Sequence, residues 1–303
     1  MRVAAVIVNY NDADSSMAQL ERIANFSNLD KIILVDNASC DDSRIRLRHY
    51  FEDKDPKRFI WIQAKRNGGY GVGNNLGVKR AAKEGMEYAL IANPDTVFQE
   101  RVVERLRQGL EQFPKLGALA PVMYKKGVLP GSRRDVLGGA SCWPLRPWLY
   151  SLLENGPLCR RIFTKALHYP SEYYIGASLR LAGAVAGSLL MVRIKDFLQA
   201  GGYDEGLFLY GEEESLARRM KKAGFLTGIL TKERYIHENS VSIDKAFSRR
   251  LKKQRLKEKS LLYYFKQYLH TGFLAGILSV LFFKAVELEI LGYELLAGEK
   301  SNG

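Results

Sequence analysis

The sequence predicts an α/β fold in which helices flank a mostly parallel, Rossmann-like sheet and a helical tail follows. Short β-branched runs alternate with longer amphipathic stretches throughout the first half of the chain, which is the pattern of βαβ units. The composition, 47% hydrophobic and 26% charged residues in a chain of 303, indicates one large folded domain with a tail. Three cysteines without metal-ligand spacing argue against a disulfide framework and a zinc ribbon.

Four predicted strands and four predicted helices alternate along the first half. The strands are residues 3–8, 31–35, 59–63 and 88–92, and the helices are residues 16–26, 44–51, 71–85 and 101–112. The regular pattern is lost between residues 125 and 178, which are rich in glycine, proline, arginine and aromatic residues. A segment of this length without periodicity predicts a functional lid or an acceptor loop. A strand at 189–193 and a helix at 213–223, ended by Gly224, restore the pattern.

The net charge of +13 is concentrated near the end of the chain. Residues 245–259 contain eight Lys or Arg and one acid, Glu258, so this tract alone contributes +7. A basic tract before an apolar segment is typical of a binder of anionic lipid headgroups, and a solvated helix face or a nucleic-acid binder are the alternatives. Nucleic acid is disfavoured because residues 249–259 contain no aromatic residue for stacking on bases.

The apolar segment that follows, residues 271–283, is too short to cross a bilayer. Lys284, Glu287 and Glu289 interrupt it before the roughly 20 apolar residues that a span requires. We therefore expect the tail to lie on an anionic membrane surface, with aromatic residues between tract and segment as interfacial contacts: Tyr263, Tyr264, Phe265 and Tyr268. The alternative is homo-oligomerisation through apolar residues at helical spacing: Phe282, Val286, Ile290 and Tyr293.

Polar clusters follow three of the early strands. They are Asn9, Tyr10 and Asn11 after the first strand, Asp36 and Asn37 after the second, and Asn93 and Asp95 after the fourth. Each cluster alone has an ordinary explanation as turn chemistry. Because the carboxyl ends of parallel strands face the ligand crevice, three clusters at successive strand ends predict a binding site there.

Two later segments extend this site. Residues 66–75 form a glycine-rich loop before a helix, where backbone N–H groups meet a diphosphate, although no Gly-Lys-Ser/Thr closes the loop as in a Walker A motif. Glu212, Glu213 and Glu214 are consecutive carboxylates. Acids at a helix start complement the macrodipole, but adjacent carboxylates also raise one another's pKa and suit one of them to general-base catalysis.

These motifs, in order, resemble those of glycosyltransferase family 2, and most closely its rhamnosyltransferase-like members. The matching segments, which span about residues 3–268, are Val8-Asn9-Tyr10-Asn11, Val35-Asp36-Asn37-Ala38-Ser39, the loop at 66–75, Asn93-Pro94-Asp95, Gly183-Ala184 with Gly187-Ser188, Gly201-Gly202-Tyr203-Asp204-Glu205 and Tyr210-Gly211-Glu212-Glu213. The resemblance implies a GT-A fold, a nucleotide-diphospho sugar donor and direct, inverting transfer.

The resemblance also implies roles for individual residues. Glu213 is the expected catalytic base, where the family has aspartate, and Asp95 is the expected ligand of Mn²⁺ or Mg²⁺. His237 is expected to complete the metal site, although a single histidine is also an ordinary surface or core residue. The expected nucleotide and sugar contacts are Asn9, Tyr10, Asn11, Asp36, Asn37, Asn67, Gly69, Gly71, Gly73, Asn74, Asn93, Gly183 and Glu212. Ser215 stands where the family commonly has aspartate.

We expect a catalytic domain at residues 1–245, with a donor half at 1–124 and an acceptor half at 125–245, and a tail at 246–303. The expected function is transfer of rhamnose from dTDP-rhamnose, or of a hexose from UDP-hexose, to a glycan or lipid-linked acceptor in cell-surface polysaccharide synthesis. The expected location is the cytoplasmic face of the cell membrane. The alternative is a nucleotide-binding or nucleotidyl-transfer protein, which would place a basic, glycine-rich loop where residues 9–12 stand.

Overall fold

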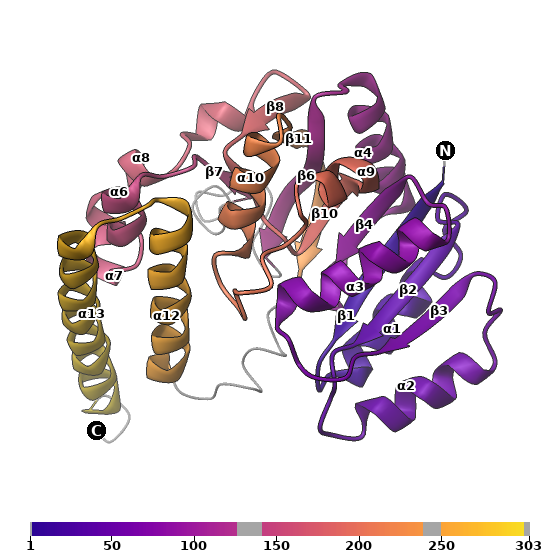
Figure 1. Cartoon of the computed structure of the whole chain (residues 1–303), viewed down its shortest axis with the longest axis horizontal. Coiled ribbons are helices and arrows are strands. Elements are labelled where there is room, and N and C mark those ends of the chain that lie inside the picture. The colour runs from indigo at the N-terminus through magenta and orange to yellow at the C-terminus, as the bar shows by residue number, and fades with distance from the viewer. Residues whose placement is uncertain (1, 126–140, 239–249, 300–303) are drawn as a thin grey trace.

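The structure is a computed structural model that describes residues 2–125, 141–238 and 250–299 (Figure 1). The described residues contain a nine-stranded sheet in the order β3-β2-β1-β4-β10-β6-β11-β5, with β8 paired to β11, and a separate pair, β7-β9. The strands are β1 (Val3–Asn9), β2 (Lys31–Asp36), β3 (Phe59–Gln63), β4 (Tyr88–Ala92), β5 (Thr96–Val97), β6 (Leu116–Lys125), β7 (Cys142–Trp143), β8 (Leu179–Ala182), β9 (Ala184–Val185), β10 (Leu189–Arg193) and β11 (Leu226–His237).

Helices connect and cover these strands. They are α1 (Ala13–Ile23), α2 (Ser43–Glu52), α3 (Tyr70–Lys83), α4 (Glu100–Gln112), α6 (Trp148–Leu153), α7 (Pro157–Ile162), α8 (Thr164–Leu167), α9 (Ile194–Gln199), α10 (Glu212–Lys222), α12 (Arg250–Tyr268) and α13 (Phe273–Glu299), with a 3₁₀ turn, η1 (Ser171–Tyr174). The predicted α/β fold is confirmed, and the early strands match within one residue. The first helix begins three residues earlier than predicted, because Ala13 and Ser16 are already buried against the sheet.

The first half of the sheet is parallel and reverses its order at one point. The chain runs outward from β1 to β2 and β3, then returns to place β4 on the other side of β1. The carboxyl ends of β1 and β4 therefore flank the crevice that such a reversal opens. Register places Asn9 opposite Asp36, so the first two polar clusters meet.

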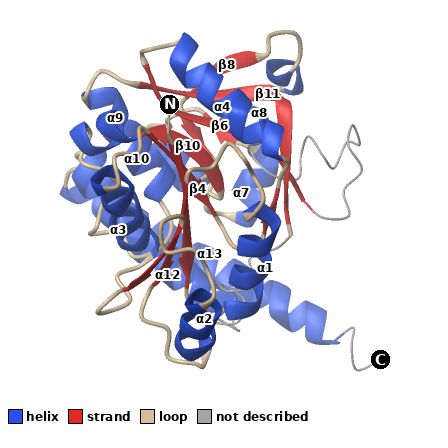
Figure 2. Ribbon diagram, turned by 90° about the vertical axis from the view of Figure 1, so that its right-hand side faces the viewer, coloured by secondary structure: helices blue, strands red, loops and turns tan. Residues whose placement is uncertain are grey.

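The sheet is buried on both faces, as the continuous apolar runs of its strands predict. In β1, Val3, Ala5 and Ile7 join the core under α1, α2 and α4, whereas Ala4 and Val6 join the core under α3, α9 and α10. Figure 2 shows α1 and α3 on opposite sides of the sheet. Alternate residues of β1 therefore pack against two layers of helices, one on each face of the sheet.

The second half of the sheet brings late residues back to the crevice. β10 is antiparallel to β4 and β6, and β11 is parallel to β6. The end of β11 also pairs with β5, which places His237 opposite Thr96. His237, far along the chain, therefore lies beside the turn that follows β4.

The segment predicted to lack regular structure, residues 125–178, contains short elements in the part that is described. These are β7, α6, α7, α8 and η1, none longer than six residues, and residues 126–140 lie outside the described part. Elements of this length show too little periodicity to be recognised in sequence.

The tail forms two helices that run side by side in opposite directions (Figure 1). Leu261, Tyr264 and Phe265 of α12 share a small core with Leu152 of α6 and Phe283 of α13. The charged residues predicted to interrupt the apolar segment do not end α13, because Glu287 pairs with Lys284 and with Arg255 of α12. Within the described ranges, no helix combines the length and apolar character of a bilayer span. Lys245, Arg249 and the predicted domain boundary lie outside these ranges.

Candidate active site

The ends of β1 and β2 are joined by a buried hydrogen-bond network. Asn9 Nδ2 donates to Asp36 Oδ1 at 2.9 Å, and both side chains are fully buried. Ser39 Oγ donates to the same carboxylate oxygen at 2.5 Å, while Gln63 Nε2 donates to Oδ2 at 2.7 Å. These contacts fix the two strand ends that form the predicted nucleotide pocket.

The loops after these strands are also tied together. Asn11 has a left-handed backbone, with φ 54°, and its N–H donates to Ser39 Oγ at 2.9 Å. Cys40 N donates back to Asn11 Oδ1 at 2.8 Å, and the half-buried Tyr10 places its hydroxyl 3.9 Å from Cys40 Sγ. The predicted residues Tyr10 and Asn11 therefore lie together in one wall of the crevice.

The glycine-rich loop packs against the loop that precedes α10. Asn67 Oδ1 accepts hydrogen bonds from Gly69 N and from Asn37 Nδ2, each at 3.0 Å. Gly69 has φ 89°, and a Cβ there would lie 2.0 Å from the carbonyl oxygen of Phe208. Only glycine allows this close approach, which sets the start of α3 against the segment leading to Glu213.

Four predicted contact residues have structural explanations. A Cβ at Gly71 would lie 2.9 Å from Tyr203 Cβ, and one at Gly73 would lie 2.7 Å from Val8 Cγ1. Asn74 Nδ2 donates to the Tyr70 carbonyl within α3 at 3.0 Å. A Cβ at Gly183 would lie 2.2 Å from the backbone N of Leu145. Close packing and helix hydrogen bonding account for these four residues, and their contact with a substrate stays a prediction.

The two predicted metal ligands lie together. His237 Nε2 is 3.1 Å from Asp95 Oδ1, and the two side chains are 21% and 11% exposed. The turn that carries Asp95 is fixed because Asn93 N donates to the Ser188 carbonyl at 2.8 Å. Among the described residues, no group of three or more His, Cys, Asp or Glu side chains is arranged to hold a metal ion. Metal binding by Asp95 and His237 stays a prediction.

Glu213 opens onto a cavity of about 420 Å³ that His237, Asn93, Tyr70 and Gly187 also line. Burial and the neighbouring Glu214 carboxylate raise the pKa of Glu213 to about 7, although its own N–H and that of Gly187 partly offset the rise. A carboxyl group with this pKa is half ionised near neutral pH, which is suited to accepting a proton.

The three consecutive glutamates occupy different environments. Glu214 Oε1 accepts a hydrogen bond from Trp143 Nε1 at 2.9 Å and lies 3.7 Å from Arg146 Nη1. Glu212 is buried, its Oε2 has no hydrogen-bond partner among the described residues, and burial together with Glu213 raises its pKa well above the ordinary value. All three line the cavity, and the role of Glu213 as the base stays a prediction.

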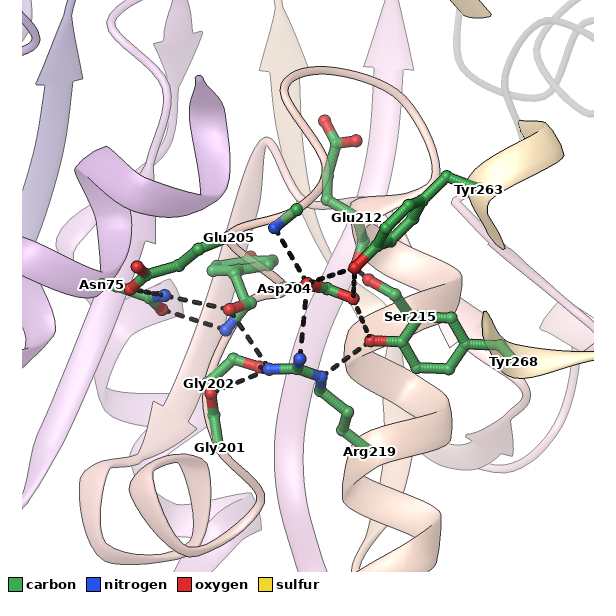
Figure 3. Close-up of polar contacts among 12 residues, drawn as sticks. Asn75, Gly201, Gly202, Asp204, Glu205, Glu212, Ser215, Arg219, Tyr263 and Tyr268 are labelled. Atoms are coloured by element: carbon green, nitrogen blue, oxygen red, sulfur yellow. Dashed lines mark hydrogen bonds and ion pairs between the residues drawn. The ribbon is translucent and has the colours of Figure 1, made fainter. Parts of the chain in front are cut away.

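Asp204, in the loop before α10, joins that loop to the tail (Figure 3). It accepts hydrogen bonds from Tyr268 at 2.5 Å and Tyr263 at 3.3 Å, both from α12, and pairs with Arg219 of α10 at 3.4 Å. Tyr264 and Phe265 are each 1% exposed, so the interpretation of these two residues as membrane contacts is wrong, whereas Tyr263 and Tyr268 are half-buried. Their hydrophobic and hydrogen-bonding groups hold the tail on the body of the protein.

Residues 4–156 match the family described as glycosyl transferase family 2, which is half of the chain. The chain belongs to glycosyltransferase family 2. It is 28% identical over 166 residues to N-acetylglucosaminyl-diphospho-decaprenol L-rhamnosyltransferase of Mycobacterium tuberculosis, a match that covers 52% of this chain and 48% of that protein. The match thus spans about half the length of this relative. It confirms the resemblance of this family 2 chain to rhamnosyltransferases, and the expectation of a glycosyltransferase is confirmed at family level.

Solved structures confirm the GT-A fold of this family 2 chain. GalNAc-T7 with UDP, GalNAc and Mn²⁺ superposes with a TM-score of 0.60 at 15% identity, covering 79% of this chain and 44% of that one. The mannosyltransferase PcManGT of Pyrobaculum calidifontis with GDP-Man and Mn²⁺ superposes with a TM-score of 0.59 at 14% identity, covering 100% and 76%. At these identities the likeness establishes the fold alone.

Sequence reasoning missed several residues of this family 2 site. Tyr70 lay inside the glycine-rich motif, and its hydroxyl donates to the Gly187 carbonyl at 2.6 Å. Trp143 and Arg146 lie in the segment without periodicity, and Lys257 lies in the basic tract, yet all three line the cavity at Glu213. Their types carry no signal by themselves, because only tertiary contacts bring them to the site.

We expect the raised pKa of Glu213 to cost stability at high pH. In the unfolded chain this carboxyl group ionises near 4.5, whereas in the folded protein it ionises near 7, so ionisation favours unfolding between these values. At pH 8, the free energy of unfolding of Glu213→Gln should therefore exceed that of the native protein by up to about 3 kcal/mol. Urea denaturation should show this as a higher midpoint concentration for the variant. At pH 4 the two proteins should unfold at the same urea concentration.

Asp53→Asn is the control for this comparison. Asp53 is exposed just after α2 and does not line the cavity at Glu213, so its substitution should leave the free energy of unfolding unchanged at both pH values. An equal effect of Glu213→Gln at both pH values would contradict a raised pKa.

Proposed function

We propose that this protein is an inverting glycosyltransferase that uses Glu213 as its general base and a nucleotide-diphospho sugar as donor. One observation carries the proposal. Glu213 and His237 line the same cavity at the carboxyl edge of the sheet, and His237 is paired with Asp95. A base and a cation site are thereby brought to one crevice, as a displacement of nucleoside diphosphate by a hydroxyl requires. Membership of glycosyltransferase family 2 favours this function over nucleotidyl transfer.

The reaction is a single displacement. The acceptor hydroxyl gives its proton to the Glu213 carboxylate as its oxygen bonds to the anomeric carbon, and the bond from that carbon to the nucleoside diphosphate breaks. The backbone of Gly187 favours the ionised form of this carboxylate, because it lowers the pKa of Glu213. Attack from the face opposite the departing diphosphate inverts the anomeric configuration.

Asp95 and His237 would hold a divalent cation, Mn²⁺ or Mg²⁺. Their carboxylate oxygen and imidazole nitrogen are 3.1 Å apart and partly exposed, so both are available as ligands. When bound, the cation would neutralise charge on the departing diphosphate. The GalNAc-T7 structure holds Mn²⁺ with UDP, and the PcManGT structure holds Mn²⁺ with GDP-Man, which supports this assignment.

We infer that the donor is dTDP-rhamnose, with a UDP-hexose as the second choice, and that the acceptor is a glycan or a lipid-linked sugar of a cell-surface polysaccharide. The similarity to a mycobacterial L-rhamnosyltransferase whose named acceptor carries a decaprenol supports both inferences. Incubation with a panel of nucleotide sugars and Mn²⁺ or Mg²⁺ tests the proposal through nucleoside diphosphate release. No release across the panel would overturn it.

We place the protein at the cytoplasmic face of the membrane, through α13 rather than through the aromatic residues of α12. The first half of α13 exposes large apolar side chains, with Phe273 82% and Leu281 61% exposed. Ile162 at the end of α7 is exposed as well, and Arg160 and Arg161 precede it. Apolar side chains flanked by cations suit an anionic lipid surface.

Replacement of the base should reduce turnover. We expect Glu213→Gln to bind donor nucleotide as tightly as the native protein but to lower kcat by about 10²- to 10⁴-fold, because the acceptor hydroxyl then has no proton acceptor. In the native protein, kcat/KM should rise with pH up to an inflection near 7, where Glu213 ionises. Steady-state assays across pH measure both effects. A larger loss of kcat in Glu212→Gln than in Glu213→Gln would assign the general base to Glu212 instead.

Loss of the strand-end carboxylate should remove the metal requirement together with activity. We expect Asp95→Ala to abolish transfer and metal-dependent nucleotide binding, measured by calorimetry with and without Mn²⁺, while thermal unfolding stays near that of the native protein. Asp53→Ala is the control, since this exposed acid stands just after α2. Native-like turnover of Asp95→Ala with metal still required would exclude Asp95 from the site.

Flotation with anionic and neutral vesicles tests the role of α13. The full chain should float with anionic vesicles, and the triple variant Phe273→Ser, Leu274→Ser, Leu281→Ser should not, because its exposed apolar contacts with lipid are lost. Ile45→Ser is the control, since Ile45 is 74% exposed on α2. A native protein that stays at the bottom and runs as a stable oligomer, with a monomeric triple variant, would instead establish an oligomer interface.

A further inference from the structure

The cavity at Glu213 is also lined by polar residues that the proposed displacement does not use. They are Lys257 of α12, Arg146 just before α6, and Asn155 just after it. Arg146 and Asn155 are each 6% exposed, so water reaches them only through the cavity. Arg146 and Asn155 belong to the segment predicted as a lid or an acceptor loop, whereas Lys257 belongs to the basic tract predicted to bind lipid headgroups. Their meeting in one cavity poses the question of what they bind.

Lys257 brings a positive charge into this space. Its ammonium makes no hydrogen bond, and no ion pair within 4 Å, in the part of the chain that the structure describes. Burial lowers the pKa of Lys257, while Glu154 and Glu214 act to raise it and Arg160 and Arg146 act to lower it. A lysine in such a place gains stability from an anion that reaches it.

Two of the cavity carboxylates, Glu214 and Glu154, have charged neighbours other than Lys257, although the buried Glu154 Oε2 accepts no hydrogen bond in the described part of the chain. Glu214 accepts from Trp143 and lies 3.7 Å from Arg146, whereas Glu154 lies 3.3 Å from His168 and 3.9 Å from the other terminal nitrogen of Arg146. Arg146 therefore stands between two acids at distances longer than hydrogen bonds, so its terminal nitrogens can take further acceptors. Lys257 is the cation that these acids leave without a close partner among the described residues.

Asn155 adds an unsatisfied acceptor. Its Nδ2 donates to the Ser151 carbonyl at 2.7 Å, whereas its buried Oδ1 has no hydrogen-bond partner among the described residues. A buried carbonyl oxygen without a donor is costly, and a hydroxyl group entering the cavity would satisfy it. The residues that line the cavity are therefore complementary to a ligand that combines a negative charge with hydroxyl groups.

We propose that Lys257, Arg146 and Asn155 form the acceptor subsite, and that the acceptor is a glycosyl phosphate. The phosphate oxygens accept from Lys257 and Arg146, a sugar hydroxyl donates to Asn155 Oδ1, and the reacting hydroxyl faces Glu213. This inference rests on the proposed function and narrows its acceptor to a sugar that carries phosphate. It also makes α12 of the tail a part of the active site.

Calorimetry on the full-length protein tests the subsite with a defined probe, N-acetylglucosamine 1-phosphate, in the absence of nucleotide and again with saturating nucleoside diphosphate and Mg²⁺. The native protein should bind this probe at least tenfold more tightly than N-acetylglucosamine or inorganic phosphate. Lys257→Met should lose that preference by about tenfold or more, as expected for removal of a charged hydrogen bond, and should leave binding of the neutral sugar unchanged. Lys257→Arg should restore it.

Lys259→Met is the matched control, because Lys259 is exposed on the same helix and does not line the cavity. An unchanged phosphate preference in Lys257→Met, or equal binding of inorganic phosphate and the sugar phosphate by the native protein, would overturn the inference. Failure of nucleoside diphosphate to bind would instead count against the proposed function, because the titration without nucleotide reads the subsite independently.

Discussion

The direction of the parallel strands is the constraint on which the rest of this structure depends. Since β1, β2 and β4 are parallel, their carboxyl ends share one edge, and the reversal of strand order between β1 and β4 opens that edge for a ligand. The polar clusters after these strands can then serve one site, although 84 residues separate Asn9 from Asn93 in the sequence. The buried bond between Asn9 and Asp36 holds two of them in place.

The later part of the chain reaches this edge by other means. The antiparallel pairing of β5 with β11 delivers His237, and the Asp204 contacts with α10 and α12 hold the loop that delivers Glu213. The tail is therefore coupled to the position of the base. The same helix that supplies Tyr263 and Tyr268 to Asp204 also supplies Lys257 to the cavity, so one packing arrangement serves both the base and the proposed acceptor contacts.

Sequence reasoning succeeded where local periodicity and local chemistry carry the information. The strand at 59–63 was predicted to the residue. Asp95 and His237, which the family resemblance assigns to one metal site, lie 3.1 Å apart. It failed for α6 to α8, which are too short for a periodic signal, and for Tyr264 and Phe265 of α12, which are buried in the protein instead of facing lipid. An aromatic residue beside a basic tract has the same composition in either environment, and only tertiary contacts distinguish them.

The three glutamates at the start of α10 show why position within a motif matters more than its composition. All three line the cavity, but Glu214 has Trp143 and Arg146 as partners, Glu212 is buried, and burial together with Glu214 raises the pKa of Glu213 to about 7. A fold selected for stability alone gains nothing from placing adjacent carboxyl groups around one cavity, since a carboxylate raises the cost of ionising its neighbour. A catalytic role explains the arrangement if one of these carboxylates accepts a proton from a substrate. Burial of the Glu213 carboxyl group lowers the stability of the folded chain, but it also raises the pKa of this group and so gives it the proton affinity that the reaction requires.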